Sequence, residues 1–184
     1  MRPSLLAAVN VVGFQAVWLA SVGGAGAGLA WAGPLAAGLF AALMLRYGGK
    51  ARADLRLLAV ALPLGLLLDS LFAASGWLVY AEAWPWASLA PVWIWSLWVG
   101  FALTLNHSMA FLRDRPLAAV ALGAVGGPLA YWTAAGAFEA VSFGAPVAWV
   151  VGALALGWGA VLPLVFHLDQ RLAAGLGQHG RATA

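Results

Sequence analysis

The sequence predicts an all-α fold, a polytopic membrane bundle of six transmembrane helices with both termini in the cytoplasm. The first observation behind this prediction is composition: 64% of the residues are hydrophobic and 8% are charged. A soluble domain carries about 25% charged residues, so this chain cannot cover a water-facing surface. The other two observations are apolar segments of membrane-spanning length and basic residues confined to alternate connections. Together they predict a single integral membrane domain over residues 1–184.

The apolar segments lie at about 4–22, 28–46, 56–75, 91–112, 116–136 and 147–168. Each is close to the length of about 20 mostly apolar residues that crosses a bilayer. The first segment resembles a secretory signal, because an early arginine precedes an apolar run. Asn10 and Gln15 interrupt that run, so we expect the segment to be kept as a span.

The basic residues predict the orientation. Every lysine and arginine falls on one side of an alternating six-span path: Arg2, Arg46, Lys50, Arg52, Arg56, Arg113, Arg115, Arg171 and Arg181. The opposite loops hold only the acids Glu82 and Glu139. The positive-inside rule therefore places both termini in the cytoplasm. Because these charges sit between apolar spans and form no basic face, nucleic acid is not an expected partner.

The tryptophans are concentrated toward the opposite side. Nine of them fall near the outer ends of spans or in outer loops: Trp18, Trp31, Trp77, Trp84, Trp86, Trp93, Trp95, Trp132 and Trp149. Tryptophan commonly anchors a helix at headgroup level, which is the simpler interpretation. The alternative is an aromatic-lined site that opens outward.

Two glycines in the fifth segment predict a helix contact. Gly123 and Gly127 are four residues apart and therefore share one helix face. A face without side chains lets a neighbouring backbone approach closely, so we expect another helix to pack there.

Asp69 is the first candidate site residue, because it lies inside the third segment. A carboxylate in hydrocarbon is costly, and no lysine or arginine lies in the interior of any segment to neutralise it. We expect Asp69 to face the bundle, either protonated or hydrogen-bonded to Tyr131, Gln15 or a tryptophan N–H. Asp69 could then serve as a proton carrier, as a general acid, as a contact for a ligand, or as a structural hydrogen bond between helices.

The second candidate site is Asn106-His107-Ser108, with Asn10 at a similar depth in the first segment. A haem or metal bound by His107 and His167 is a weaker alternative, because the chain has no cysteine and no carboxylate at a recognisable ligand spacing. We therefore expect no cofactor, and a His107 ring bonded to a backbone carbonyl or a lipid headgroup.

Several motifs are similar to those of a known family. They are LDSL at Leu68–Leu71, PVWxxxLWxxFALTLNHS across Pro91–Ser108, GGPLAY at Gly126–Tyr131, and the first-span pattern of Asn10, Phe14, Gln15 and Trp18. They resemble an uncharacterised six-span family of the bacterial inner membrane, domain of unknown function 2878. The resemblance implies a fold and a location but no activity. Members often lie near genes similar to cyclopropane-fatty-acid synthases and flavin-dependent oxidoreductases, which implies a link to membrane-lipid modification.

The function that these observations favour is the binding of a lipid or other hydrophobic molecule in an outward-opening intramembrane cavity. The protein would then be an accessory to lipid modification, with membrane lipids as its partners. The candidate ligand-binding residues are Asp69, Trp93, Trp98, Asn106, His107, Tyr131, Asn10 and Gln15. One alternative is an intramembrane enzyme that uses Asp69, His107 and Tyr131, and another is a small transporter or channel. The sequence contains no phosphate-binding glycine loop, serine elbow or HExxH motif, so whether the protein is an enzyme stays open.

Overall fold

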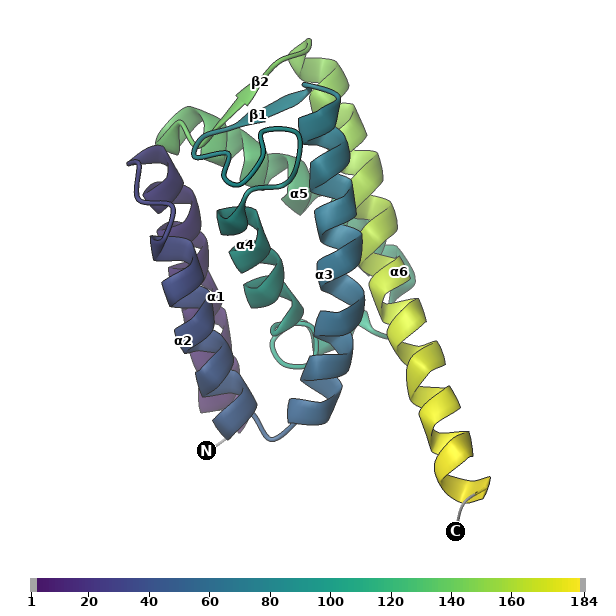
Figure 1. The fold of residues 1–184 in the computed structure, drawn as a ribbon. Helices are drawn as coiled ribbons and strands as arrows, with labels where there is room; N and C mark the ends of the chain where they lie inside the picture. Colours follow the sequence, from purple (N-terminus) through teal and green to yellow (C-terminus); the bar gives the residue numbers. More distant parts are fainter. Residues whose placement is uncertain (1–2, 183–184) are drawn as a thin grey trace.

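A computed structural model describes residues 3–182, with side chains described from 4 to 175. Arg2 and the side chain of Arg181 lie outside that part. The chain is mainly helical (Figure 1), which confirms the predicted all-α class. The helices are α1 (Pro3–Gly26), α2 (Ala32–Tyr47), α3 (Ala51–Ala74), α4 (Val92–Ala102), α5 (Pro116–Phe138) and α6 (Val147–Ala182). A short 3-10 helix, η1 (Ala110–Leu112), and two strands, β1 (Leu78–Tyr80) and β2 (Val141–Phe143), complete the elements.

Four of these helices are long and apolar enough to cross a membrane: α1, α3, α5 and α6. The other two are apolar but shorter, with 16 residues in α2 and 11 in α4. At 1.5 Å per residue, α4 is only about 17 Å long. The predicted span over 91–112 is therefore wrong as one continuous helix, because the helix ends at Ala102 and residues 103–109 form turns.

One local side chain and two from distant parts of the chain explain this break. The Thr104 hydroxyl donates to the carbonyl of Phe101 at 2.7 Å, which is the local competition with helix bonding that threonine favours. Asn10 donates through Nδ2 to the Leu103 carbonyl at 2.9 Å. Lys50 donates through Nζ to the Asn106 carbonyl at 2.6 Å. These donors replace helical partners, so irregular backbone is stable inside the bundle.

Helix α4 lies at the centre of the bundle. It contacts α1, α2 and α3, while α6 packs against α3 and α5. Figure 1 shows it between the α1–α2 pair and α3. Most of its side chains are buried, including Trp93, Ile94, Trp98 and Phe101. The buried side chains of this short helix therefore form part of the interior of the bundle.

Glycines permit the closest contacts around the centre. A Cβ atom at Gly123 would overlap the Trp158 carbonyl, and one at Gly127 would overlap the Trp158 ring. The predicted close approach on α5 is thus confirmed, and its partner is α6. On α3, a Cβ atom at Gly65 would overlap the Trp98 ring, so this glycine leaves the space that Trp98 occupies.

The end of the bundle remote from the two termini carries a two-stranded antiparallel ribbon, which the sequence did not predict (Figure 1). Leu78 pairs with Phe143 and Tyr80 with Val141. The indole N–H of Trp93 donates to the Ala81 carbonyl at 2.9 Å, which joins α4 to the ribbon. The exposed tryptophans are Trp31, Trp84, Trp86, Trp95, Trp132 and Trp149, and they gather toward this end of the bundle.

Candidate functional site

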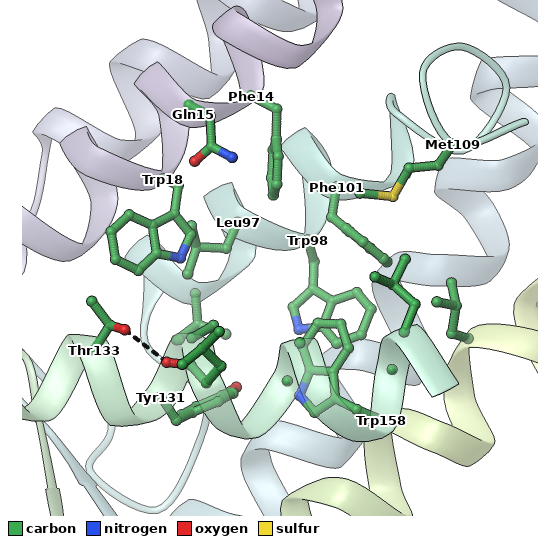
Figure 2. A pocket seen from close by; sticks show the side chains of 18 residues that line it. Phe14, Gln15, Trp18, Leu97, Trp98, Phe101, Met109, Tyr131, Thr133 and Trp158 are labelled. Atoms are coloured by element: carbon green, nitrogen blue, oxygen red, sulfur yellow. Dashed lines mark hydrogen bonds between the residues drawn. The ribbon is translucent and has the colours of Figure 1, made fainter. Parts of the chain in front are cut away.

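A cavity of about 370 Å³ lies between α1 and α5, with α4 behind it (Figure 2). Its volume falls in the range of about 300–1,000 Å³ that is usual for ligand sites. Six aromatic side chains line it: Phe14, Trp18, Trp98, Phe101, Tyr131 and Trp158. No lysine, arginine, aspartate or glutamate lines it. The site is therefore an uncharged, aromatic-walled pocket.

The aromatic wall is held in a defined geometry. Trp98 of α4 and Trp158 of α6 are stacked, with ring centroids 4.5 Å apart and planes 10° from parallel. Phe101 meets both rings edge-on, at 5.8 Å and 5.5 Å. Offset-stacked and edge-to-face pairs are the favoured arrangements of aromatic rings. Together with the glycines beneath them, these contacts give the cavity a preformed wall.

Asp69 lies directly behind this wall and is fully buried. It accepts hydrogen bonds from the Tyr80 hydroxyl at 2.8 Å, from the Trp98 indole N–H at 2.6 Å, and from the Tyr131 hydroxyl. Tyr131 and tryptophan were two of the partner types expected from the sequence, and Gln15, the third, does not hydrogen-bond to it. No basic side chain in residues 4–175 forms an ion pair with Asp69.

The three donors to Asp69 come from separate elements: β1, α4 and α5. Burial, and then the charge of Asp69, raise the pKa of Tyr80 well above its usual value, so Tyr80 remains a donor at neutral pH. Trp98 and Tyr131 each line the cavity while their polar atoms point to Asp69. Asp69 thus fixes two wall residues and does not itself line the cavity.

The opening of the cavity faces the side of the bundle. Phe138 packs edge-on against Trp18 at 5.6 Å, and Gly26 lies against the Phe138 backbone, so α1 and α5 meet at the ribbon end. The exposed lining residues, Gln15, Leu122 and Leu129, lie near the middle of these two helices. The outward opening expected from the tryptophan distribution stays a prediction.

The residues of the second predicted site form a separate polar cluster. Buried Asp54 of α3 accepts from Asn106 Nδ2 at 2.9 Å and is 3.0 Å from His107 Nε2. Asn10 accepts from the Ser108 hydroxyl at 2.6 Å. None of these residues lines the cavity; Met109, the next residue along, does. The cluster therefore holds the backbone next to Met109 in place and does not line the cavity itself.

An ionic group adjoins this cluster. Asp169 of α6 is 2.5 Å from Arg56 Nε and 2.7 Å from Arg113 Nη1. Arg113 also donates through Nη2 to Asn106 Oδ1 at 2.7 Å. Sequence analysis missed Asp54 and Asp169, because acids beside loop arginines resemble ordinary surface charges. Their position at the ends of apolar runs, on the side where every basic residue lies, was the available signal.

The two histidines considered for a haem or metal are placed differently. The His107 side chain is 2% exposed and its Nε2 is next to Asp54, whereas His167 is exposed on α6. In the described part of the chain, no three or more His, Cys, Asp or Glu side chains gather as metal ligands.

The structure brings together three of the eight candidate ligand-binding residues: Gln15, Trp98 and Tyr131. Trp93 is buried elsewhere, edge-on to Tyr80 at 5.8 Å. Phe101, Met109 and Trp158 line the cavity but were not among the candidates. For Trp158 the signal was the small-residue face at Gly123 and Gly127. Such a face leaves room for a large side chain or for the backbone of a neighbouring helix.

Comparisons with other proteins give one match. No curated protein and no solved structure matches the chain. The model of one family, described as protein of unknown function (DUF2878), matches residues 7–164. That range contains every residue that lines the cavity. The chain therefore belongs to the DUF2878 family.

Proposed function

We propose that this protein is an integral protein of the bacterial inner membrane that holds a lipid or another hydrophobic molecule in the lateral cavity between α1 and α5. The observation that carries the proposal is the preformed, uncharged aromatic wall around about 370 Å³ of space. Holding such a molecule suits an accessory to membrane-lipid modification, as the family resemblance implies.

The arrangement of charges supports a six-span orientation with both termini in the cytoplasm. The described end of α6 and the start of α1 lie at the same end of the bundle (Figure 1). The ion pairs of Arg56 and Arg113 lie toward that end, and the exposed tryptophans lie toward the other. Basic residues favour the cytoplasmic side and indole rings favour the interface. In this proposal α2 and α4 are the two short crossings.

The chemistry of the cavity supports a hydrophobic occupant. A cavity of about 150 Å³ holds one benzene molecule, so the volume here suits a longer chain or a ring with a chain. Flat indole and phenyl rings supply a large contact area to such a molecule. The opening lies between the middles of two apolar helices, so a molecule dissolved in the bilayer reaches it without passing through water.

Binding is favoured over intramembrane catalysis by the placement of the titratable groups. Asp69 has hydrogen-bond donors on both carboxyl oxygens and lies outside the cavity. His107 belongs to the separate polar cluster. An acid–base group must come within hydrogen-bond distance of the atom on which it acts. Neither side chain lines the space that a ligand would occupy.

Filling the cavity tests the proposal. A Cβ atom at Gly126 would meet no atom within 4 Å, so Gly126→Phe places a ring in the cavity without a backbone clash. We expect this variant to lose co-purifying lipid, measured by native mass spectrometry, while its melting temperature stays within a few degrees of wild type.

Gly136→Phe is the matched control, because Gly136 lies on the same helix, has equally open surroundings and does not line the cavity. It should keep the bound lipid. The proposal is wrong if both variants retain the same lipids as the wild type.

A further inference from the structure

Apart from the buried Trp158 N–H, two polar side chains at the cavity have no hydrogen-bond partner among the described residues: the Gln15 amide and the Trp18 indole. Each lines the cavity, and neither donates to or accepts from any described group. They are three positions apart on α1 and therefore share a face. Figure 2 shows both on the α1 side of the cavity, across from Thr133 and Tyr131 of α5.

The other polar groups around the cavity are already engaged or enclosed. Tyr131 and Trp98 donate to Asp69, and the Thr133 hydroxyl donates to the Leu129 carbonyl at 2.8 Å. The Trp158 N–H is buried beside Tyr131 and makes no hydrogen bond of normal geometry. The free donors accessible from the opening are thus those of Gln15 and Trp18.

Gln15 lies deep in the proposed membrane, and Trp18 lies about 4.5 Å further along the helix axis. Gln15 follows the first residue of α1 by twelve positions, which is about 18 Å along the helix axis and close to its midpoint. No water is available at that depth, so an amide or indole N–H without a partner is unfavourable. Both groups gain a partner only if the bound molecule supplies an acceptor.

We propose, on the basis of the function proposed above, that the occupant is an uncharged lipid with a carbonyl group in its hydrophobic part. Its carbonyl oxygen accepts hydrogen bonds from Gln15 Nε2 and Trp18 Nε1. A carboxylate or phosphate is disfavoured at this position, because no cationic side chain lines the cavity to offset its desolvation. The carbonyl belongs either to a chain, as in a ketone or an ester, or to a quinone ring.

The experiment measures how three tritiated probes partition into nanodiscs that contain the full chain, relative to empty nanodiscs. The probes are laurone, a straight-chain ketone with a central carbonyl; decylubiquinone, a quinone with an alkyl chain; and tricosane, a hydrocarbon as long as laurone. We expect at least one carbonyl probe to be retained more strongly than tricosane. Its infrared C=O band should shift to lower frequency in the wild type, as hydrogen bonding requires.

Gln15→Leu removes the amide from an exposed side chain that has no protein partner, so the fold is not at stake. It should reduce carbonyl-probe retention about fivefold, the loss expected for one neutral hydrogen bond, and leave tricosane retention unchanged. The matched control is Gln170→Leu, on an exposed position of α6 outside the cavity, which should alter neither.

The outcomes separate the two proposals. Preferential retention of laurone assigns a chain carbonyl, and preferential retention of decylubiquinone assigns a ring carbonyl. Equal retention of all three probes, or a Gln15→Leu variant that behaves as wild type, overturns carbonyl recognition while leaving the apolar cavity as a binding site. If no probe, tricosane included, exceeds empty nanodiscs, the proposed function itself is wrong.

Discussion

Asp69 connects the ribbon of β1 and β2 to two walls of the cavity through a single carboxyl group. Its three donors come from Tyr80, Trp98 and Tyr131, which are separated from it by 11, 29 and 62 positions in sequence. Hydrogen bonds to a buried carboxyl stabilise the arrangement only while every donor keeps its acceptor. The residue is therefore more important for the shape of the cavity than for direct contact with a ligand.

Replacing Asp69 tests this role. Asp69→Leu leaves three buried donors without an acceptor, at about 1–3 kcal/mol for each unsatisfied group. Asp69→Asn keeps one carbonyl oxygen and should be destabilised less. We expect melting temperatures in detergent to fall in the order wild type, Asn variant, Leu variant. Asp114→Leu, at an exposed acid in a loop, should melt like the wild type, and an Asp69→Leu variant as stable as the wild type would contradict the role assigned to Asp69.

At the scale of elements, the most unusual segment is the chain from Leu103 to Arg113. It has the apolar start of a membrane helix but is folded as turns and one short 3-10 helix. Its stability depends on Asn10, Lys50 and Asp54, which lie on other elements. The segment closes the bundle beneath the cavity and supplies Met109 to its lining.

Removing one of these supports should loosen the segment. Asp54→Leu takes away the acceptor for Asn106 Nδ2 and the partner of His107 Nε2. We expect faster amide hydrogen exchange across residues 103–113, because local opening costs less once those bonds are lost. Exchange in the middle of α5 should stay unchanged. The exposed Asp114 again offers a matched substitution, Asp114→Leu, and equal exchange in both variants would show that Asp54 does not hold the segment.

The elements that the sequence predicted are those determined by local pattern. Long apolar runs mark α1, α3, α5 and α6, and two glycines mark the α5–α6 contact. The end of α4 at Ala102 was not predictable from its own residues, because Asn10 and Lys50 reach it from 93 and 56 positions away. For the same reason, neither the paired strands nor the stacking of Trp98 on Trp158 has a local signal.

The candidate site was predicted in its residue types but not in its assembly. Asp69, Trp98 and Tyr131 were recognised as polar or aromatic groups inside apolar spans, and they do meet. Trp98 and Tyr131 line the cavity whereas Asp69 lies behind them. This difference depends on the direction of each side chain, which composition does not encode. The lateral opening depends on where α1 and α5 separate, and this is set by the Phe138 contact with Trp18.

For the whole molecule, the short helices do not match the thickness of a bilayer, and the two ends of the bundle carry different kinds of residue. The hydrocarbon core is about 30 Å thick, whereas α2 with its 16 residues extends about 24 Å. Exposed tryptophans around one end, and Asp169 with its two arginines toward the other, supply interfacial groups that accommodate short helices. The two ends should therefore face different compartments, and the sidedness follows from the basic residues.

Cysteine labelling tests that sidedness, and the chain has no native cysteine to interfere. In intact spheroplasts, cysteines placed at Glu82 and Glu139 should react with an impermeant thiol reagent added outside. Both positions are exposed in connections next to the ribbon, so access does not limit the reaction. Cysteines at Lys50 and Asp114, which are exposed toward the opposite end, should react only after the membrane is permeabilised.

The four positions together also test the number of crossings. Lys50 lies between α2 and α3, Glu82 between α3 and α4, Asp114 between α4 and α5, and Glu139 between α5 and α6. Alternating protection along the chain requires that short α4, with the turns after it, carries the chain across the membrane. Labelling of Asp114 from outside, together with Glu82, would mean that α4 returns to the side from which it started. Labelling of Lys50 and Asp114 alone would reverse the orientation and place the charged cluster outside.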